Sequence, residues 1–334
     1  MKESFTNVPV ALIFFARPDV LETTFQAIRK VRPKKIFLIQ DGPRINRPDD
    51  IENIKKCREI VERIDWDCEI FKDYSENNLG CGMRIFSGLN WAFNYVDRLA
   101  VIEDDCVPSK SFFNFSEELL ERFLYDERIG MISGMNNLGY YEMSEHDYFF
   151  TEYGSVWGWA TWKRVWETVD FNMGFLNDKD AERLITNLYG SFFYNEGKRK
   201  ISKINNGVKL TSWSYQFGLN MFLNSYLTIV PKSNLISNIG LTANSANTLS
   251  TVKYTPKALR SLYYMSSYKL EFPLNHPKYI IKDIEYKKKM DRLMGNGYPL
   301  VKLYRLAESI IYRILDGDFK SILKGLKRRM GINN

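Results

Sequence analysis

Short apolar runs alternate along the first hundred residues with segments in which apolar residues recur every three or four positions. The apolar runs are residues 8–16, 35–40, 68–72 and 99–105. Each run has the length of a buried strand, and each segment between them has the spacing of a helix with one apolar face. Strands that alternate with helices form parallel sheets, so this region predicts an α/β fold with a doubly wound, mostly parallel sheet.

The pattern changes in the second half of the chain. Apolar spacing predicts helices over 112–125 and 212–223, and strands over 129–133 and 227–230. Residues 167–209 are highly charged and poorly periodic, which predicts helices and loops that cover one face. Residues 251–334 predict a separate extension that is basic and mostly helical. We therefore expect one domain over 1–250, with halves at 1–110 and 111–250, followed by an extension.

Composition and charge exclude several classes of protein. The 334 residues are 45% hydrophobic and 26% charged, as in ordinary globular proteins, and the net charge of +7 suits an anionic partner. The four cysteines are scattered and the only histidines are His146 and His276, which argues against a zinc site. The first apolar run is too short for a signal peptide, and no run approaches the length of a membrane span. These features predict a cytoplasmic protein in a reducing compartment.

Three consecutive acids end the fourth predicted strand. Glu103, Asp104 and Asp105 follow the apolar run directly, and a turn signal at Pro108 comes soon after. In open α/β sheets, ligands bind at the carboxyl ends of the strands. Carboxylates gathered there repel one another unless a cation compensates them, and a divalent cation would also carry phosphates. The alternative is a solvated acidic turn.

Other polar residues follow the neighbouring predicted strands. Arg17 follows the first strand and Asp41 the second, so both are expected near the same sheet edge. An Asp can accept a hydrogen bond from a pyrimidine N–H, and an Arg can stack on a base or pair with its oxygens. Both residues could equally be surface loop charges.

A glycine-rich loop precedes the third predicted helix. Gly80 and Gly82 stand where a dinucleotide fingerprint would lie, but Ile85 occupies the position of its third glycine. No phosphate loop of the Walker type is present. Asn78 and Gly80 are candidate donor-binding residues, because backbone N–H groups at a helix start can bind a phosphate. A plain turn explains the same pattern.

Two further patterns leave alternatives open. The tryptophans of 157–162 stand in an irregular extended segment and suit either a hydrophobic core or a platform for a sugar. Near the C-terminus, apolar residues of 310–326 recur at helical spacing among lysines and arginines. Such a helix either lies on an anionic membrane or packs on the domain with a solvated basic end.

Six segments in a fixed order resemble one protein family. They are 9–18, 40–44, 77–82, 102–108 with Phe112 and Phe113, 157–162 and 234–240. Together they resemble the bacterial nucleotide-diphospho-sugar transferases related to N-acetylglucosaminyltransferase I, which have the GT-A fold. The resemblance covers about residues 8–250 and implies a nucleotide-binding half over 1–110 and an acceptor half over 111–250.

The resemblance implies roles for individual residues. Asp105 would bind Mn²⁺ (or Mg²⁺) under the donor diphosphate, with Glu103 and Asp104 near the donor sugar or ribose. Arg17 and Asp41 match the positions that hold the uracil of a UDP-sugar. The acceptor would lie on tryptophans, for which the candidates are Trp157, Trp159 and Trp213.

The sequence departs from the family where the general base is expected. Relatives carry an Asp beside a tryptophan that matches Trp213, but Thr211, Ser212 and Ser214 surround it here. The histidine that often follows 234–240 is also missing. Another acid can serve as the base, and Glu152, Asp178 and Asp180 are the candidates. Alternatively, the enzyme retains configuration with the leaving phosphate as the base, or the protein is catalytically weak or inactive.

The resulting prediction is a metal-dependent glycosyltransferase. It would move a sugar from a UDP-sugar to a cell-envelope glycan or a lipid-linked glycan. It would be cytoplasmic, and its basic C-terminal helix would hold it on the inner face of the cell membrane. No nucleic acid partner is expected. The alternatives are a non-catalytic protein that binds nucleotide sugars and a nucleotidyltransferase. The latter usually needs a basic, glycine-rich loop near its N-terminus, which Ala16-Arg17-Pro18 does not provide.

Overall fold

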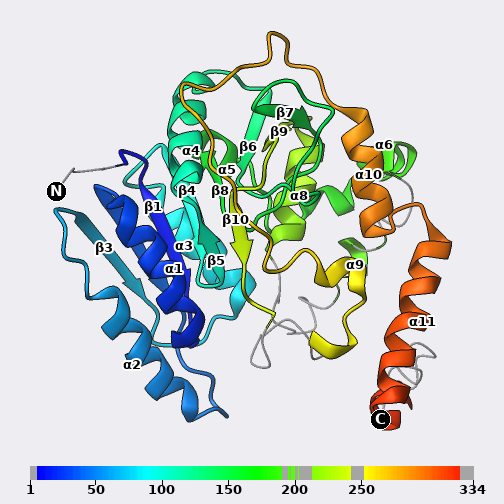
Figure 1. The fold of residues 1–334 in the computed structure, drawn as a ribbon, viewed down its shortest axis with the longest axis horizontal. Helices are drawn as coiled ribbons and strands as arrows, with labels where there is room; N and C mark the ends of the chain where they lie inside the picture. Colours follow the sequence, from blue (N-terminus) through cyan, green and yellow to red (C-terminus); the bar gives the residue numbers. More distant parts are fainter. Residues whose placement is uncertain are drawn as a thin grey trace.

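A computed structural model describes residues 6–189, 213–241 and 252–323, with positions 195, 197–199 and 202. One eight-stranded sheet runs through the molecule, in the order β3-β2-β1-β4-β8-β6-β9-β7 (Figure 1). Its strands are β1 Val10–Phe14, β2 Lys35–Gln40, β3 Glu69–Tyr74, β4 Arg98–Glu103, β6 Ile129–Ser133, β7 Tyr148–Thr151, β8 Trp159–Trp162 and β9 Leu227–Pro231. Strands β5 Cys106–Pro108 and β10 Ile236–Asn238 form a separate antiparallel pair.

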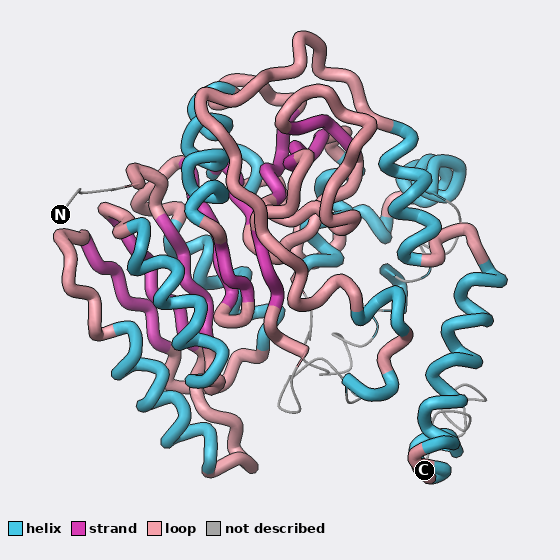
Figure 2. Tube along the Cα trace, in the orientation of Figure 1, coloured by secondary structure: helices cyan, strands magenta, loops and turns pink. Residues whose placement is uncertain are grey.

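The helices cover both faces of this sheet (Figure 2). The main ones are α1 Pro18–Val31, α2 Asp49–Val61, α3 Cys81–Ala92, α4 Lys110–Arg122, α6 Lys179–Tyr189, α8 Ser214–Leu223, α10 Ile284–Met294 and α11 Pro299–Leu315. Short turns of helix are α5 Lys163–Trp166, η1 Gly174–Asn177, η2 Val252–Tyr254 and α9 Lys257–Arg260. Helices α1, α2 and α4 lie in front of the sheet in Figure 1, and α3 lies behind it.

The first four strands of the sheet are all parallel, as the sequence predicts. Strands β1 and β2 are fully or almost fully buried, because helices cover both of their faces. Beyond β4 the sheet becomes mixed, since β8 pairs antiparallel with both β4 and β6. The predicted class is therefore confirmed: an α/β fold with a mostly parallel sheet flanked by helices.

Strand β8 corrects one sequence prediction. Residues 159–162 form a regular, fully buried strand rather than an irregular extended segment. The sequence pattern does not predict this strand, because both of its faces are buried and its residues therefore show no alternation of apolar and polar side chains. Gly158 precedes the strand with φ +69, and a Cβ there would lie 2.4 Å from a side-chain carbon of Ile236. The chain can therefore enter this strand only with glycine at that position.

The predicted extension is not separate from the domain. Leu262, Leu270 and Leu274 belong to the main hydrophobic core, so position 250 does not divide two cores. Residues 265–283 also contain no helix, and their only regular pairing is an isolated β-bridge between Lys282 and Phe150. Pro273 and Pro277 explain part of this, because proline lacks a backbone N–H and interrupts helices. In the part of this region that the structure describes, two helices reach ten residues: α10 buries Tyr286 and Met290, whereas α11 has no buried residue.

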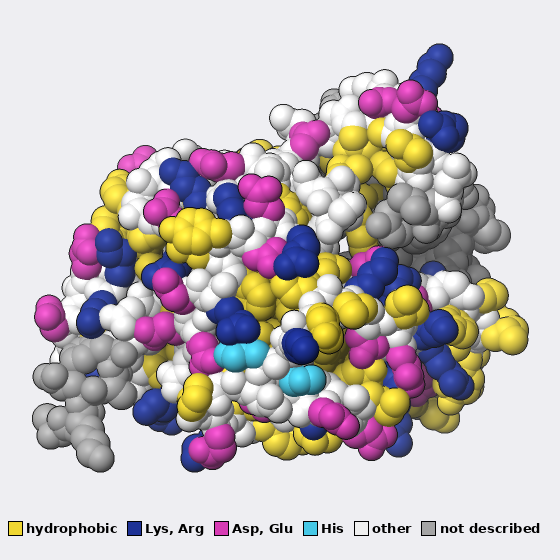
Figure 3. Space-filling model, turned by 90° about the horizontal axis from the view of Figure 1, so that it is seen from above, with side chains coloured by type: hydrophobic (Ala, Val, Ile, Leu, Met, Phe, Trp, Pro, Cys, Tyr) yellow, Lys and Arg dark blue, Asp and Glu magenta, His cyan; other side chains and the backbone are white. Residues whose placement is uncertain are grey.

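Two surface properties bear on possible partners. Among the described residues, no helix combines the length and apolar character needed to cross a bilayer. Figure 3 shows one face of the molecule, on which basic and acidic side chains are interspersed. The positive net charge is therefore not gathered into a single field on that face.

Candidate functional site

A cavity of about 560 Å³ opens at the carboxyl edge of β1, β2 and β4. The parallel register explains its position, because it sets Phe14 beside Gln40 and Ile13 beside Glu103, so the residues after all three strands meet. Its lining includes the predicted site residues Arg17, Asp41, Asn78, Gly80, Glu103, Asp104 and Trp157. This volume lies in the usual range for small-molecule sites.

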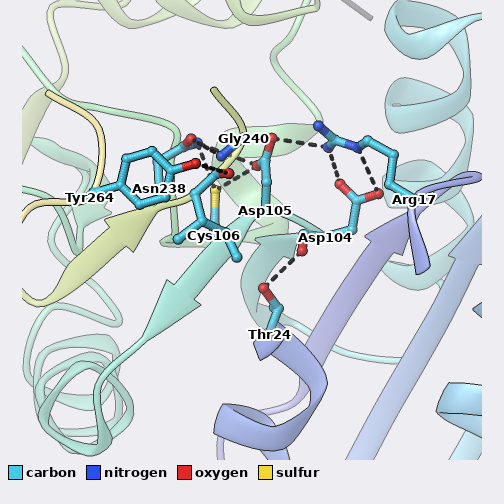
Figure 4. Close-up of polar contacts among 9 residues, drawn as sticks. Arg17, Thr24, Asp104, Asp105, Cys106, Asn238, Gly240 and Tyr264 are labelled. Atoms are coloured by element: carbon cyan, nitrogen blue, oxygen red, sulfur yellow. Dashed lines mark hydrogen bonds and ion pairs between the residues drawn. The ribbon is translucent and has the colours of Figure 1, made fainter. Parts of the chain in front are cut away.

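The acidic turn after β4 is compensated by Arg17 (Figure 4). The Nη2 of Arg17 donates to Asp104 and, at 2.9 Å, to Oδ2 of Asp105. Burial lowers the pKa of Arg17, but the two carboxylate charges outweigh burial and raise the pKa above its ordinary value. The guanidinium therefore stays charged and neutralises part of the repulsion between the two acids.

Asp105 is held from its other side by the β5–β10 pair. Asn238 lies opposite Cys106 in this pair, and its Nδ2 donates to Oδ1 of Asp105 at 3.3 Å. The carboxylate also lies against Gly240, where a built Cβ would come within 2.0 Å of Oδ2. Asp105 is thus oriented by Asn238, 133 positions later in the chain, and by Gly240, a relation that the sequence does not reveal.

The donor set fits a cation that arrives with phosphates rather than one held by protein alone. Within the part of the chain that the structure describes, no group of three or more His, Cys, Asp or Glu side chains could hold a metal ion. Asp104 lines the cavity, whereas Asp105 does not line it but contacts Arg17 and Gly240, which do. Mg²⁺ or Mn²⁺ commonly takes one or two carboxylates plus substrate phosphates. Arg17 donates to both carboxylates, so a cation bound at Asp105 would replace the hydrogen bond between Arg17 and Asp105.

Glu103 adds a third acid with a perturbed ionisation. Burial is the main cause, and the charges of Asp105 and Asp104 add to it, so the pKa of Glu103 rises to about 8. The protonated carboxyl is therefore the favoured form around neutral pH when no cation is bound. A cation bound beside it would favour the carboxylate instead.

We expect the thermal stability of the metal-free protein to fall as pH rises toward the pKa of Glu103. The folded state holds the Glu103 proton more tightly than the unfolded state, whose pKa is near 4.5, so the folding advantage is lost as pH passes about 8. Glu103→Gln, which mimics the protonated form, should flatten this dependence. Melting temperatures of both proteins between about pH 6 and about pH 9 test it; equal slopes would contradict the raised pKa.

Asp41 organises the glycine-rich loop. Its Oδ1 accepts from the backbone N–H of Gly42 and Leu79, at 3.0 and 2.8 Å, and its Oδ2 accepts from Gly80 N and Asn78 Nδ2, at 2.9 and 3.1 Å. A carboxylate offers about four lone-pair positions, and all four are used by the protein. Asp41 therefore shapes the cavity through residues 78–80, and a base contact would have to displace one of these bonds.

One wall of the cavity was not found from the sequence. Arg44 donates to the buried Asp50 through Nε and Nη2, both at 2.7 Å, and its guanidinium lies 5.3 Å from the ring centre of Phe15. This pair fixes an aromatic face and a positive charge beside the predicted uracil residues. Arg44 lies in the loop after β2, and Asp50 lies six positions later in the first turn of α2. An aspartate at a helix start is ordinary, so nothing in the pattern set this pair apart.

The predicted acceptor tryptophans have different environments. Trp157 lines the cavity, and its ring centre lies 4.9 Å from that of Tyr263, a residue of the predicted extension. Trp159 and Trp213 are buried in the core, with rings stacked at 5.3 Å. Neither of these two tryptophans offers an open ring face to an acceptor, because both indole rings are packed inside the hydrophobic core.

A second cavity of about 480 Å³ shares Trp157 with the first. Its wall is mostly apolar and includes five methionines: Met131, Met135, Met221, Met290 and Met294. Methionine is flexible and polarisable, so such walls adapt to apolar ligands. Glu152, Ser155 and Ser214 are among its polar residues.

The structure separates the three candidate bases. Glu152 lines the second cavity and pairs with Lys282, with Oε1 and Nζ 2.5 Å apart. Asp178 accepts from backbone N–H groups at the start of α6, and Asp180 is exposed and pairs with Arg183. Neither of the latter two lines either cavity. Thr211 and Ser212 lie outside the described residues, as does the segment after Leu241 where relatives carry a histidine.

The chain thus has an α/β fold with a charged cavity at the carboxyl edge of its sheet. Comparison of the sequence with protein-family models and with curated proteins gave no match.

Among solved structures, the chain is similar to a UDP-glucose pyrophosphorylase complexed with UDP-glucose (12% identity, 60% of this chain and 99% of that chain, TM-score 0.29). It is also similar to an apo UDP-glucose pyrophosphorylase (9% identity, 69% of this chain and 93% of that chain, TM-score 0.35). A third similar structure is 4-diphosphocytidyl-2C-methyl-D-erythritolsynthase from Anaerococcus prevotii DSM 20548 (13% identity, 65% of this chain and 96% of that chain, TM-score 0.30). The functional proposal rests on the cavities of this chain and not on these distant likenesses.

Proposed function

We propose that this protein transfers a sugar from a UDP-sugar to an acceptor hydroxyl group, assisted by Mn²⁺ or Mg²⁺. The observation that carries the proposal is the pairing of two cavities at Trp157. One has an acidic turn and arginines that suit a nucleoside diphosphate with its cation, and the other has an apolar wall that suits a different molecule. A transferase needs two such adjacent sites.

In this proposal, the first cavity binds the donor. Asp105, with Asp104 beside it, would hold the cation together with the donor diphosphate, and the cation would neutralise the charge of the leaving group. Arg17 would release Asp105 and remain paired with Asp104, where its charge still faces the diphosphate. Arg44 with Phe15, and the loop that Asp41 holds, form the end of the cavity available to the uracil.

The second cavity would bind the acceptor. Glu152 is the acid on its wall, and we assign it the role of general base that takes the proton of the acceptor hydroxyl. Lys282 donates to Oε1 of Glu152 and fixes the position of the carboxylate on this wall. The apolar methionine wall suits the lipid part of a lipid-linked glycan of the cell envelope, which is the acceptor class that we propose.

Glu152→Gln should reduce sugar transfer by about 10²- to 10⁴-fold, the usual contribution of a general base. Donor binding should be unchanged, because Glu152 does not line the first cavity. Transfer rates and UDP affinity of the variant measure the two effects. Asp180→Asn is the matched control, since it neutralises an exposed acid and should keep the full rate. A Glu152→Gln enzyme with the full rate would remove Glu152 from the chemistry.

A nucleotidyltransferase would use similar acids but a different reaction. Such an enzyme usually has a glycine-rich loop after its first strand, whereas here Phe15, Ala16 and Arg17 lead directly into Pro18 of α1.

Product analysis separates the candidate functions. The protein with Mn²⁺ is given either a UDP-sugar or UTP with a sugar 1-phosphate, and UDP and pyrophosphate are measured. Slow release of UDP from the UDP-sugar supports the proposal. Pyrophosphate from UTP would identify a nucleotidyltransferase, and UDP binding without either product would identify a non-catalytic binding protein.

A further inference from the structure

Helix α11 presents an apolar stripe that no described part of the chain covers. The residues of this stripe are Leu300, Leu303, Tyr304, Ile311, Ile314 and Leu315, and they are between 48% and 80% exposed. Successive positions in a helix are rotated by about 100°, so this spacing places them along one side. Phe319 and Leu323 continue the exposed apolar character beyond the helix end.

The opposite side of α11 is the one that holds it to the protein. Glu308 accepts from the backbone N–H of Lys257 at 3.1 Å, and the guanidinium of Arg313 lies 4.4 Å from the ring centre of Tyr254. Arg305 donates to the carbonyl oxygen of Leu293. Val301, Leu306 and Ile310 are half-buried and lie off the stripe, so apolar residues also contribute to the attached side. The stripe itself is apolar surface that this packing leaves unused, and it faces outward at the edge of the molecule in Figure 1.

Charge indicates what covers the stripe. Residues 319–334 follow it directly and contain five basic residues and no acidic one: Lys320, Lys324, Lys327, Arg328 and Arg329. Two copies of the chain that met in parallel at the stripe would bring these like charges together, which is unfavourable, and an antiparallel pair would gain nothing from them. An anionic lipid surface instead attracts them while it takes up the apolar side chains.

We propose that α11 docks on the headgroup layer of an anionic lipid bilayer. The helix lies parallel to the surface, with the stripe between the headgroups, and the positive charge that follows it in the sequence strengthens the attraction to acidic lipids. This interaction is independent of the proposed function, because no residue of α11 lines either cavity. It places the protein at a membrane whatever reaction it catalyses.

Flotation with lipid vesicles tests this docking. The full-length protein should float with vesicles that contain phosphatidylglycerol and remain behind with vesicles of phosphatidylcholine alone, and high salt should weaken the binding. Ile311→Asp should lower the bound-to-free ratio at least about tenfold, because it places a charge in the apolar stripe. Since Ile311 is 53% exposed, the substitution should leave the fold intact.

Ile51→Asp on α2 is the matched control. It adds the same charge at an isoleucine that is 64% exposed but lies away from α11, and it should float like the wild type. Equal flotation of Ile311→Asp and wild type would overturn the proposal, as would no flotation of the wild type. A wild-type dimer in sedimentation that Ile311→Asp converts to a monomer would identify a second copy as the occupant. UDP binding by Ile311→Asp should equal that of wild type, so a failure of the functional proposal remains distinguishable.

Discussion

Asp105→Ala is expected to abolish the Mn²⁺-dependent part of UDP binding, with a loss of affinity of at least about 100-fold. Asp105 is the acid that both Arg17 and Asn238 orient at the edge of the cavity. Its removal leaves Asp104, whose carboxylate is already paired with Arg17, as the remaining carboxylate of the turn. One carboxylate that is already neutralised offers little to a cation. Calorimetric titration of UDP, with and without Mn²⁺, measures the effect.

Asp180→Ala is the control for this experiment. It removes an exposed acid whose pairing with Arg183 is a surface ion pair, and such pairs contribute little. Its UDP affinity should match that of the wild type in both conditions. If Asp105→Ala also binds UDP as tightly as wild type with Mn²⁺ present, Asp105 is not a metal ligand.

Gly240→Ala should weaken Mn²⁺-dependent UDP binding almost as strongly as the loss of Asp105 itself. A Cβ at this position would lie 2.0 Å from Oδ2 and 2.7 Å from Cγ of Asp105, which is closer than such atoms can approach. The carboxylate must therefore move, because the backbone of Gly240 is fixed by a hydrogen bond from its N–H to Oδ1 of Asn238, at 2.8 Å. A displaced Asp105 loses its place at the cavity while the rest of the sheet is unaffected.

Gly218→Ala is the matched control, since a Cβ there meets nothing within 4 Å. Gly218 lies within α8, where alanine also favours helix formation. This variant should keep UDP affinity, and its melting temperature should equal or exceed that of the wild type. Unchanged binding by Gly240→Ala would show that the position of Asp105 does not matter for the cation.

Local pattern was sufficient for the first half of the fold. Residues 8–105 alternate between apolar runs and helical spacing, so β1 to β4 and the helices between them could be predicted within a few residues. The carboxyl-edge rule then placed Arg17, Asp41, Glu103 and Asp104 in one cavity, with Asp105 in contact with its wall. These inferences succeed because they depend on neighbours in sequence and on a general property of parallel sheets.

The rest of the site depends on contacts between distant segments. Asn238 and Gly240 orient Asp105, and Tyr263 reaches the cavity from a region predicted to be a separate extension. Trp157 and Trp159 are two positions apart, yet one lines the cavity and the other is in the core. Gly158, with φ +69, separates Trp157 from β8, so the regular strand geometry that buries Trp159 does not extend to Trp157. A run of tryptophans gives no sign of this. No local pattern records which segments meet.

The measurement that tests the account most directly is a thermal-shift comparison of UDP, GDP, CDP and NAD, each with and without Mn²⁺. If the cavity binds a uridine diphosphate through a cation at Asp105, UDP with Mn²⁺ should raise the melting temperature most, and UDP alone should raise it much less. No stabilisation by UDP with Mn²⁺, or equal stabilisation with and without the cation, would contradict the account.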